Sequence, residues 1–184
     1  VIVNDTNAPI VRLNGSANIT LEAGASYQEF GATASDLNDV VTNIVISGEV
    51  NTNKPGNYSL TYTAIDNSGN TGKALRFIKV EDTTPPELTL NGNQELILEA
   101  GDEYKELGAT AIDIVDGDIS RNIIVEGSVN TRKVGRTTIT YKIQDSSGNK
   151  ASKTRTVEVK DTTPPLIKLF GPSSITLEAG TPYN

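Results

Sequence analysis

The chain of 184 residues contains no cysteine, histidine, methionine or tryptophan. The missing cysteine rules out disulfides and thiol nucleophiles, and the missing histidine removes the commonest general base and the commonest transition-metal ligand. A protein of a reducing compartment does not rely on disulfides, and many proteins outside the cell also do without cysteine, so its absence does not decide the location. The composition therefore predicts that the chain is not an enzyme.

Positive charge is also scarce. Lysine and arginine together number 16 against 23 aspartates and glutamates, which gives a net charge of −7 and a sequence pI of about 4.6. The basic residues are scattered singly, whereas a phosphate-binding surface needs them clustered. No apolar run approaches the ~18 residues of a membrane-spanning helix. We therefore expect neither a nucleic-acid partner nor a membrane span in this chain.

What the chain does contain is a repeat. The run Asp-Thr-Thr-Pro-Pro at 82–86 returns at 161–165, and a weaker copy, Asp-Thr-Asn-Ala-Pro, opens the chain at 5–9. The copies begin 77 and 79 residues apart, and a fixed period of this size indicates tandem folded units. The predicted units are the tail of a preceding repeat (1–4), a first repeat (5–81), a second repeat (82–160) and the first part of a third repeat (161–184).

The copies align closely along their length. Leu-Glu-Ala-Gly occurs at 21–24, 98–101 and 177–180, and Gly-Ala-Thr-Ala at 31–34 and 108–111. Asp36 matches Asp113 and Asp39 matches Asp118, but Asp116 and Gly117 have no counterparts in the first repeat. This two-residue insertion accounts for the longer second spacing.

Each copy has the pattern of short strands. Ile139, Tyr141 and Ile143 alternate with polar residues, which is the period-two pattern of a half-buried strand. Threonine, valine and isoleucine dominate the other runs, and Asn-Gly pairs at 14–15 and 91–92 supply turn residues that tolerate positive φ. About seven strands per copy, with no helix signal, predict an all-β chain of tandem β-sandwiches.

The motifs together resemble a known family. Asp-Thr-Thr-Pro-Pro at 82–86, Gly-Ala-Thr-Ala-x-Asp at 108–113, Lys-x-Gly at 133–135 and Asp-x-x-Gly-Asn at 145–149 are similar to the bacterial immunoglobulin-like surface-protein repeat, which is akin to the hyalin repeat. The resemblance covers essentially the whole chain. It implies immunoglobulin-like β-sandwiches joined by short proline-containing linkers, located outside the cell or on its surface. Such repeats occur in surface proteins, secreted enzymes and some crystal toxins.

Five aspartates of the second repeat form the candidate site. In the implied sandwich the linker residue Asp82, the strand-end residues Asp113 and Asp145, and the loop residues Asp116 and Asp118 converge at one pole, next to the preceding repeat. Ca²⁺ takes six to eight oxygen ligands, which converging carboxylates can supply, whereas a bare cluster would repel itself. We hypothesise that this pole binds Ca²⁺ and stiffens the joint between repeats.

The first repeat has a smaller set of the same kind, Asp5, Asp36, Asp39 and Asp66. In both repeats the alternative is that each aspartate serves a turn, as Asp145 would by capping the turn that follows it. The spacing is not that of an EF-hand, because the twelfth loop position counted from Asp113 is Ile124.

We expect the other repeated residues, which are glutamates, tyrosines and prolines, to have structural roles. We expect the repeated glutamates to lie on solvated faces, namely Glu22, Glu99, Glu178, Glu29 and Glu106. We expect Tyr27, Tyr104 and Tyr183 to pack their rings over the end of the sandwich with solvated hydroxyls, with sugar binding as the alternative. The proline pairs at 85–86 and 164–165 restrict the backbone and predict semi-rigid linkers.

The predicted function is structural. The chain is expected to be an extracellular spacer, stalk or fibre-forming segment of a cell-surface protein such as an adhesin, a surface layer or a filament. Two alternatives stay open, a glycan- or protein-binding module and an accessory region of a secreted enzyme or toxin. The expected partners are neighbouring repeats of the same chain and, through strand addition by residues 161–184, other copies.

Overall fold

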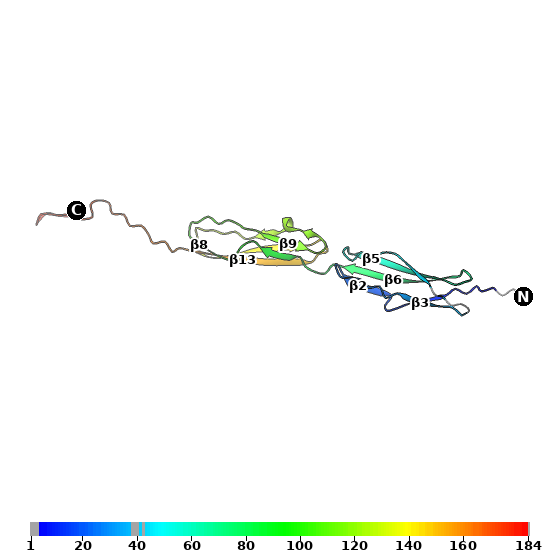
Figure 1. Ribbon diagram of the computed structural model, residues 1–184. Helices are drawn as coiled ribbons and strands as arrows, with labels where there is room; N and C mark the ends of the chain where they lie inside the picture. Colours follow the sequence, from blue (N-terminus) through cyan, green and yellow to red (C-terminus); the bar gives the residue numbers. More distant parts are fainter. Residues whose placement is uncertain (1–3, 38–40, 42, 184) are drawn as a thin grey trace.

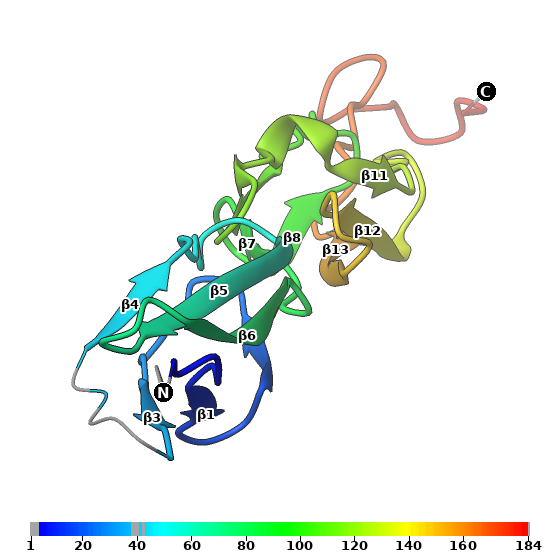
Figure 2. The same ribbon diagram turned by 90° about the vertical axis from the view of Figure 1, so that its right-hand side faces the viewer.

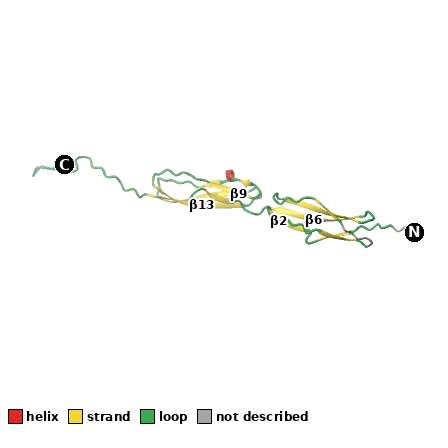
Figure 3. Ribbon diagram, viewed as in Figure 1, coloured by secondary structure: helices red, strands yellow, loops and turns green. Residues whose placement is uncertain are grey.

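Two β-sandwich units lie end to end and are followed by an extended C-terminal segment (Figure 1; turned by 90° in Figure 2). The structure, a computed structural model, describes residues 4–37, 41 and 43–183. Asp39 and most of the predicted N-terminal tail, residues 1–3, lie outside the described residues. Figure 3 shows the strands and the connecting loops of both units, with a short helical turn in the second unit.

The first unit is built from a smaller and a larger sheet. Its strands are β1 (Ile10–Leu13), β2 (Asn18–Glu22), β3 (Ala32–Ser35), β4 (Ile44–Ser47), β5 (Gly56–Ile65) and β6 (Thr71–Glu81). β1 pairs with β3 in the small sheet, and the larger sheet has the order β2-β6-β5-β4. The β5–β6 hairpin is antiparallel, whereas β2 runs parallel to β6.

The second unit repeats this plan. Its elements are β7 (Glu87–Leu90), β8 (Glu95–Glu99), β9 (Ala109–Asp113), β10 (Gly117–Asp118), the 3₁₀ turn η1 (Ser120–Asn122), β11 (Ile124–Glu126), β12 (Gly135–Gln144) and β13 (Lys150–Lys160). One sheet has the order β10-β9-β7 and the other β11-β12-β13-β8. β10 consists of Gly117, the second residue of the insertion, and Asp118, and it pairs with β9 at the edge of the smaller sheet.

The core of each unit lies between its two sheets. In the second unit Ile139, Tyr141 and Ile143 of β12 are buried against Leu88 and Ala111 of the opposite sheet. These are the inward positions of the alternating pattern, which places every second side chain on the same face. In the first unit Leu60 and Tyr62 of β5 and Ile78 and Val80 of β6 lie on the larger sheet, and Val11 and Leu13 of β1 pack against them. The prediction of tandem β-sandwiches is confirmed.

The opening segment of each repeat is divided between the two sheets. β7 pairs antiparallel with β9, whereas β8, five residues further on, pairs parallel with β13 in the other sheet. β7 therefore begins where β9 ends, and this brings the linker that precedes β7 to the end of β9. The candidate aspartates sit at this pole.

The C-terminal segment differs from the two units. Residues 161–183 contain no strand, and Leu166 and Phe170 in it are 94% and 99% exposed. Among the residues that the structure describes, no helix has the length and apolarity needed to cross a membrane.

Candidate metal centre at the repeat junction

Three buried aspartates meet at the pole of the second unit that faces the first. Asp82 follows the end of β6 in the linker, Asp113 is the last residue of β9, and Asp145 directly follows β12. One carboxylate oxygen from each lies within 4.8 Å of those of the other two. The three residues are only 5–7% exposed. The convergence predicted from the sequence is thus present for these three residues.

Three oxygens of this cluster have no hydrogen-bond partner. They are both carboxylate oxygens of Asp82 and the Oδ2 atom of Asp113, and all three are buried. A buried carboxylate without a compensating partner costs several kcal/mol, on the order of the penalty for a desolvated ion. Among the described residues no lysine or arginine forms an ion pair with any of the three aspartates. The pole therefore has negative charge that the chain itself does not neutralise.

The remaining oxygens hold the site in shape. Asp113 Oδ1 accepts hydrogen bonds from the backbone N–H groups of Val115 (2.8 Å) and Asp116 (3.0 Å). The two oxygens of Asp145 accept from the backbone N–H (2.8 Å) and the side-chain amide (2.9 Å) of Asn149. The same amide donates to the backbone carbonyl of Asp82 at 3.1 Å. Asn149, which sequence reasoning had assigned only to a loop motif, thus ties the linker to the cluster.

This donor set fits a hard divalent cation. It offers carboxylate oxygens only, from three segments fixed by β-structure, and Ca²⁺ prefers oxygen ligands that include carboxylates, carbonyls and water. It contains none of the nitrogen or sulfur ligands that favour softer metals.

The other two predicted ligands of the second repeat are engaged elsewhere. Asp116 accepts hydrogen bonds from the backbone N–H and the hydroxyl of Ser146, both at 2.7 Å. These bonds lower the pKa of Asp116. Asp118 accepts from the hydroxyl (2.6 Å) and the backbone N–H (2.9 Å) of Ser120, which lowers its pKa as well. Asp118 thus serves a local turn, as in the alternative interpretation, whereas Asp116 holds the loop of Ser146, 30 residues away in the sequence.

The first repeat has part of the same arrangement. Asp66 is buried and accepts two hydrogen bonds from Asn70, whose side-chain amide also donates to the backbone carbonyl of Asp5 at 3.2 Å. Asp5 Oδ2 is buried without a partner. Asp36 is partly buried at the end of β3, and Asp39 lies outside the described residues. Within the described part of the chain, three acidic groups come within metal-binding distance only in the second repeat.

A glutamate holds the linker on the other side of each junction. Glu22, at the end of β2, accepts hydrogen bonds from the backbone N–H and hydroxyl of Thr83 and from the hydroxyl of Thr84, at 2.7–2.8 Å. Glu99 does the same for Thr162 and Thr163. The hydroxyl and the backbone N–H of Thr162 contribute most to lowering the pKa of Glu99 to about 2. Glu22 and Glu99 are therefore partly exposed carboxylates that also accept hydrogen bonds from the linker threonines.

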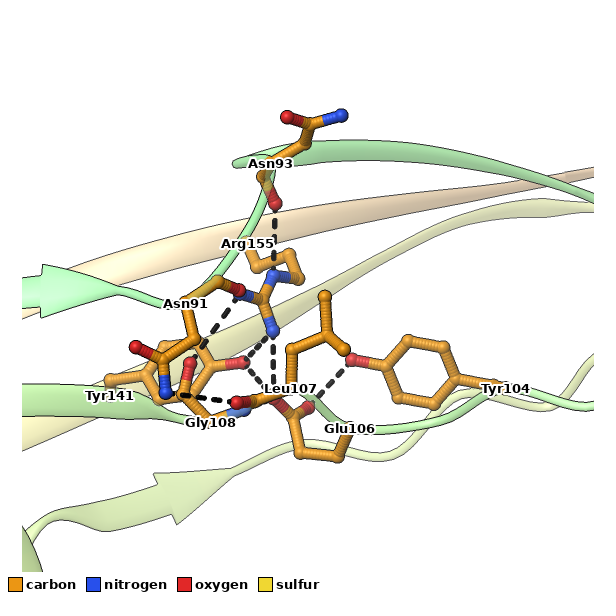
Figure 4. A network of polar contacts seen from close by, with 8 residues as sticks. All are labelled: Asn91, Asn93, Tyr104, Glu106, Leu107, Gly108, Tyr141 and Arg155. Atoms are coloured by element: carbon orange, nitrogen blue, oxygen red, sulfur yellow. Dashed lines mark hydrogen bonds and ion pairs between the residues drawn. The ribbon is translucent and has the colours of Figure 1, made fainter.

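A buried arginine in the middle of the last strand organises each unit. Arg155 is fully buried and donates to the carbonyl of Asn93 (3.1 Å), to Glu106 (2.7 Å) and to the hydroxyl of Tyr141 (2.7 Å), as Figure 4 shows. Tyr104 donates to the other oxygen of Glu106 at 2.6 Å. Its hydroxyl is therefore paired, contrary to the expectation of a solvated one. Sequence reasoning missed this network, because a single arginine in an exposed-looking strand pattern carries no signal of burial.

The network appears in both repeats. In the first, Arg76 is fully buried and contacts Glu29, Tyr62 and the carbonyl of Ser16. Burial disfavours the charged form of Glu29 and of Glu106, but hydrogen bonds from two tyrosines and one backbone N–H, together with the arginine charge, hold both pKa values below the usual range. Glu29 and Glu106 are thus structural ion-pair partners rather than solvated carboxylates.

The chain is similar to several known proteins. Hyalin from Strongylocentrotus purpuratus is 29% identical over 98% of this chain and 16% of its own length. Pesticidal crystal protein Cry22Aa from Bacillus thuringiensis is 28% identical over 74% of this chain and 20% of its own length. The chain therefore spans a fifth or less of these relatives. Among solved structures, the lipoprotein BT2262 from Bacteroides thetaiotaomicron shares 29% identity over 44% of this chain and 40% of its own, with a TM-score of 0.40.

The family model described as "Bacterial surface protein, Ig-like domain" matches twice, at residues 11–80 and 88–159. The two matches coincide with the two β-sandwiches and together cover well over half of the chain. With its tandem immunoglobulin-like units, the chain belongs to this bacterial surface protein family, as an extracellular or cell-surface module.

Proposed function

We propose that this chain is a structural spacer of a cell-surface protein, in which Ca²⁺ bound by Asp82, Asp113 and Asp145 stiffens the joint between two repeats. The observation that carries the proposal is the set of three buried carboxylate oxygens without partners, on Asp82 and Asp113. Their position at the linker means that a bound cation joins the connecting segment to the second unit. Asp82 comes from the linker, while Asp113 and Asp145 belong to the sandwich.

The units proposed for this array are those that the sequence predicts, 5–81 and 82–160, with 161–184 as the first part of a third repeat. Its proposed partners are the neighbouring repeats. The absence of enzymatic activity stays a prediction.

The test is a thermal melt of the full chain in millimolar Ca²⁺ and in chelator. A ligand that binds only the native state stabilises it by mass action, so Ca²⁺ at about 100 times its Kd adds about 2.7 kcal/mol and raises the Tm by several degrees. The Tm response is expected to disappear in Asp82→Asn and to persist in Asp118→Asn, since Asp118 bonds to Ser120 instead.

The variants also distinguish a cation site from aspartates that only stabilise turns. Because Asp82→Asn removes one of the mutually repelling charges, its Tm in chelator is expected to equal or exceed that of the unaltered chain. A Tm of the unaltered chain that is the same in Ca²⁺ and in chelator would refute the calcium site. Isothermal titration with Ca²⁺ alone provides the stoichiometry, with one strong site expected.

A second proposed partner is another copy of the chain. Residues 161–183 expose apolar side chains such as Leu166, Ile167 and Phe170 and form no strand in the described part of the chain. Such a segment can add to the sheet edge of a neighbour. Light scattering after size exclusion tests this, since strand addition predicts a mass that rises with concentration and does so only while residues 161–184 are present.

A further inference from the structure

We propose that the loop carrying Asp113 is a calcium-dependent contact between the two repeats, in which Ile114 and Val115 dock on the end of the first unit. We call residues 113–116 the junction loop. The proposal rests on the calcium site proposed above and adds the means by which that site acts on the neighbouring repeat. It also names the docking surface, which is the Leu-Glu-Ala-Gly segment at residues 21–24.

The contact itself is close. A Cβ atom placed on Gly24 would lie 2.6 Å from Cδ1 and 3.2 Å from Cγ1 of Ile114. Gly24 also has a φ of +81°, so a glycine is favoured there both by backbone conformation and by the space that Ile114 occupies. Val115 packs against the apolar cluster of the first unit that contains Ala23, Leu60 and Tyr62. Two consecutive side chains of the second repeat thus cover the end of the first.

The docked residues are linked to the metal centre through one carboxylate. Asp113 Oδ1 accepts the backbone N–H of Val115 at 2.8 Å, while its Oδ2 atom is buried without a partner beside Asp82 and Asp145. One oxygen therefore shapes the junction loop and the other faces the cation position. Without a cation, repulsion among the carboxylates acts directly on the side chain that holds Val115 in place.

The first repeat carries an aliphatic residue at the corresponding position. Leu37 aligns with Ile114, directly after Asp36, and is 90% exposed, whereas Ile114 is 63% exposed. An aliphatic side chain after the strand-end aspartate is thus a shared feature of the two repeats. It becomes partly covered where the end of another unit lies against it.

The closest control for Ile114 lies two residues away. Ile112 on β9 is 61% exposed and pairs with Glu87 and Asp118 within its own unit. Ile114→Ala and Ile112→Ala therefore remove the same side chain at nearly equal exposure, and only the first removes a contact between repeats. Neither position belongs to a buried core, so both variants are expected to fold.

The experiment measures Ca²⁺ affinity of the full chain by isothermal titration, together with ¹⁵N relaxation of each repeat. Coupling is reciprocal, so if Ca²⁺ favours docking, loss of docking weakens Ca²⁺ binding. We expect Ile114→Ala to raise the Kd for Ca²⁺ about fivefold, a typical coupling, and Ile112→Ala to leave it unchanged. The two repeats are expected to tumble as one body in Ca²⁺ and with separate correlation times in chelator.

The outcomes distinguish the two proposals. If the unaltered chain binds no Ca²⁺, the calcium site is wrong and the dependence of docking on calcium is wrong with it. If Ca²⁺ binds but Ile114→Ala leaves both the Kd and the relaxation unchanged, the site stands and the docking proposal is overturned. Tumbling as one body in chelator would also overturn it, because the contact would then need no cation.

Discussion

At the scale of single residues, one buried arginine in each unit holds several segments of that unit together. Arg76 and Arg155 are fully buried, and each donates hydrogen bonds to backbone carbonyls and to a glutamate. Arg155 also donates to the hydroxyl of Tyr141. The planar guanidinium presents five N–H donors in a fixed geometry that lysine does not reproduce. The tyrosine ring adds a cation–π contact, with the guanidinium carbon of Arg155 5.4 Å from the ring centre of Tyr141.

Replacing Arg155 by lysine is therefore expected to destabilise the second repeat by roughly 3 kcal/mol or more, because buried carbonyls lose their donors. The matched control is Arg136→Lys, since Arg136 has an exposed side chain and pairs with Glu158 at 3.4 Å. Its cost is expected to be under about 1 kcal/mol. Urea unfolding followed by circular dichroism measures both. Equal costs would show that burial of Arg155 contributes little.

At the scale of elements, each linker is held from both sides. Glu22 and Glu99, at the ends of β2 and β8, accept hydrogen bonds from the two threonines of the following Asp-Thr-Thr-Pro-Pro run. The backbone N–H of Ala23 and of Ala100 also donates to the last residue of β6 and β13, at 2.7 Å in both cases. The repeat motifs at 21–24 and 82–86 thus contact each other through these hydrogen bonds.

This contact has a defined pH dependence. The pKa of Glu99 is lowered to about 2, so the folded state holds its proton more weakly than the unfolded chain does. The resulting stabilisation is complete above the ordinary glutamate pKa of about 4.3 and is lost as the pH falls towards 2. The expected result is that carbon chemical shifts of the Glu99 carboxylate titrate near pH 2 in an NMR experiment. A midpoint near the ordinary value would mean that the threonines do not hold it.

Amide exchange adds a check by substitution. Glu99→Gln keeps the size of the side chain but removes its charge, and hydrogen bonds to a charged acceptor are roughly twice as strong as those to a neutral one. The backbone N–H groups of Thr162 and Thr163 should then exchange with solvent faster. The exchange rates of the N–H groups of Thr83 and Thr84 should not change, because these threonines bond to Glu22, which is unaltered.

At the scale of the whole molecule, the two units lie in line, with short linkers between strands of neighbouring sandwiches (Figure 1). β6 ends at Glu81 and β7 begins at Glu87, so five residues connect the units. Two of these residues are Pro85 and Pro86, which restrict the backbone to extended conformations. A connection this short and restricted, with contacts on both sides, is consistent with an extracellular module that keeps its neighbours aligned.

The proline pair and the calcium site are expected to contribute separately to this alignment. In chelator, where only the linker and Glu22 restrain the joint, Pro85→Ala with Pro86→Ala should broaden the distribution of end-to-end distances measured by small-angle X-ray scattering. In Ca²⁺ the broadening should be smaller. If the distance distribution of the double variant in chelator stays as narrow as that of the unaltered chain, the prolines are strand-start residues without a role in alignment.

Much of the fold could be predicted because its signals are local. Alternating residues such as Ile139, Tyr141 and Ile143 mark one face of a strand wherever that strand pairs, and the 77- and 79-residue spacings mark repeated units. The site was partly predictable for the same reason. Asp82, Asp113 and Asp145 stand at strand ends, and strand direction alone brings such ends to one pole.

By itself, then, the sequence determined the repeat, the strand pattern, the family and the group of aspartates at the junction, since each depends on spacing along the chain. Only the tertiary structure decided which aspartates stay unpaired, that Asp116 and Asp118 turn to serines, and that Ile114 reaches Gly24. It also decided that Arg155 is buried, with carbonyl partners more than 60 residues away in the chain. Such outcomes depend on distances between segments far apart in sequence, where burial and competing partners choose among side chains of identical type.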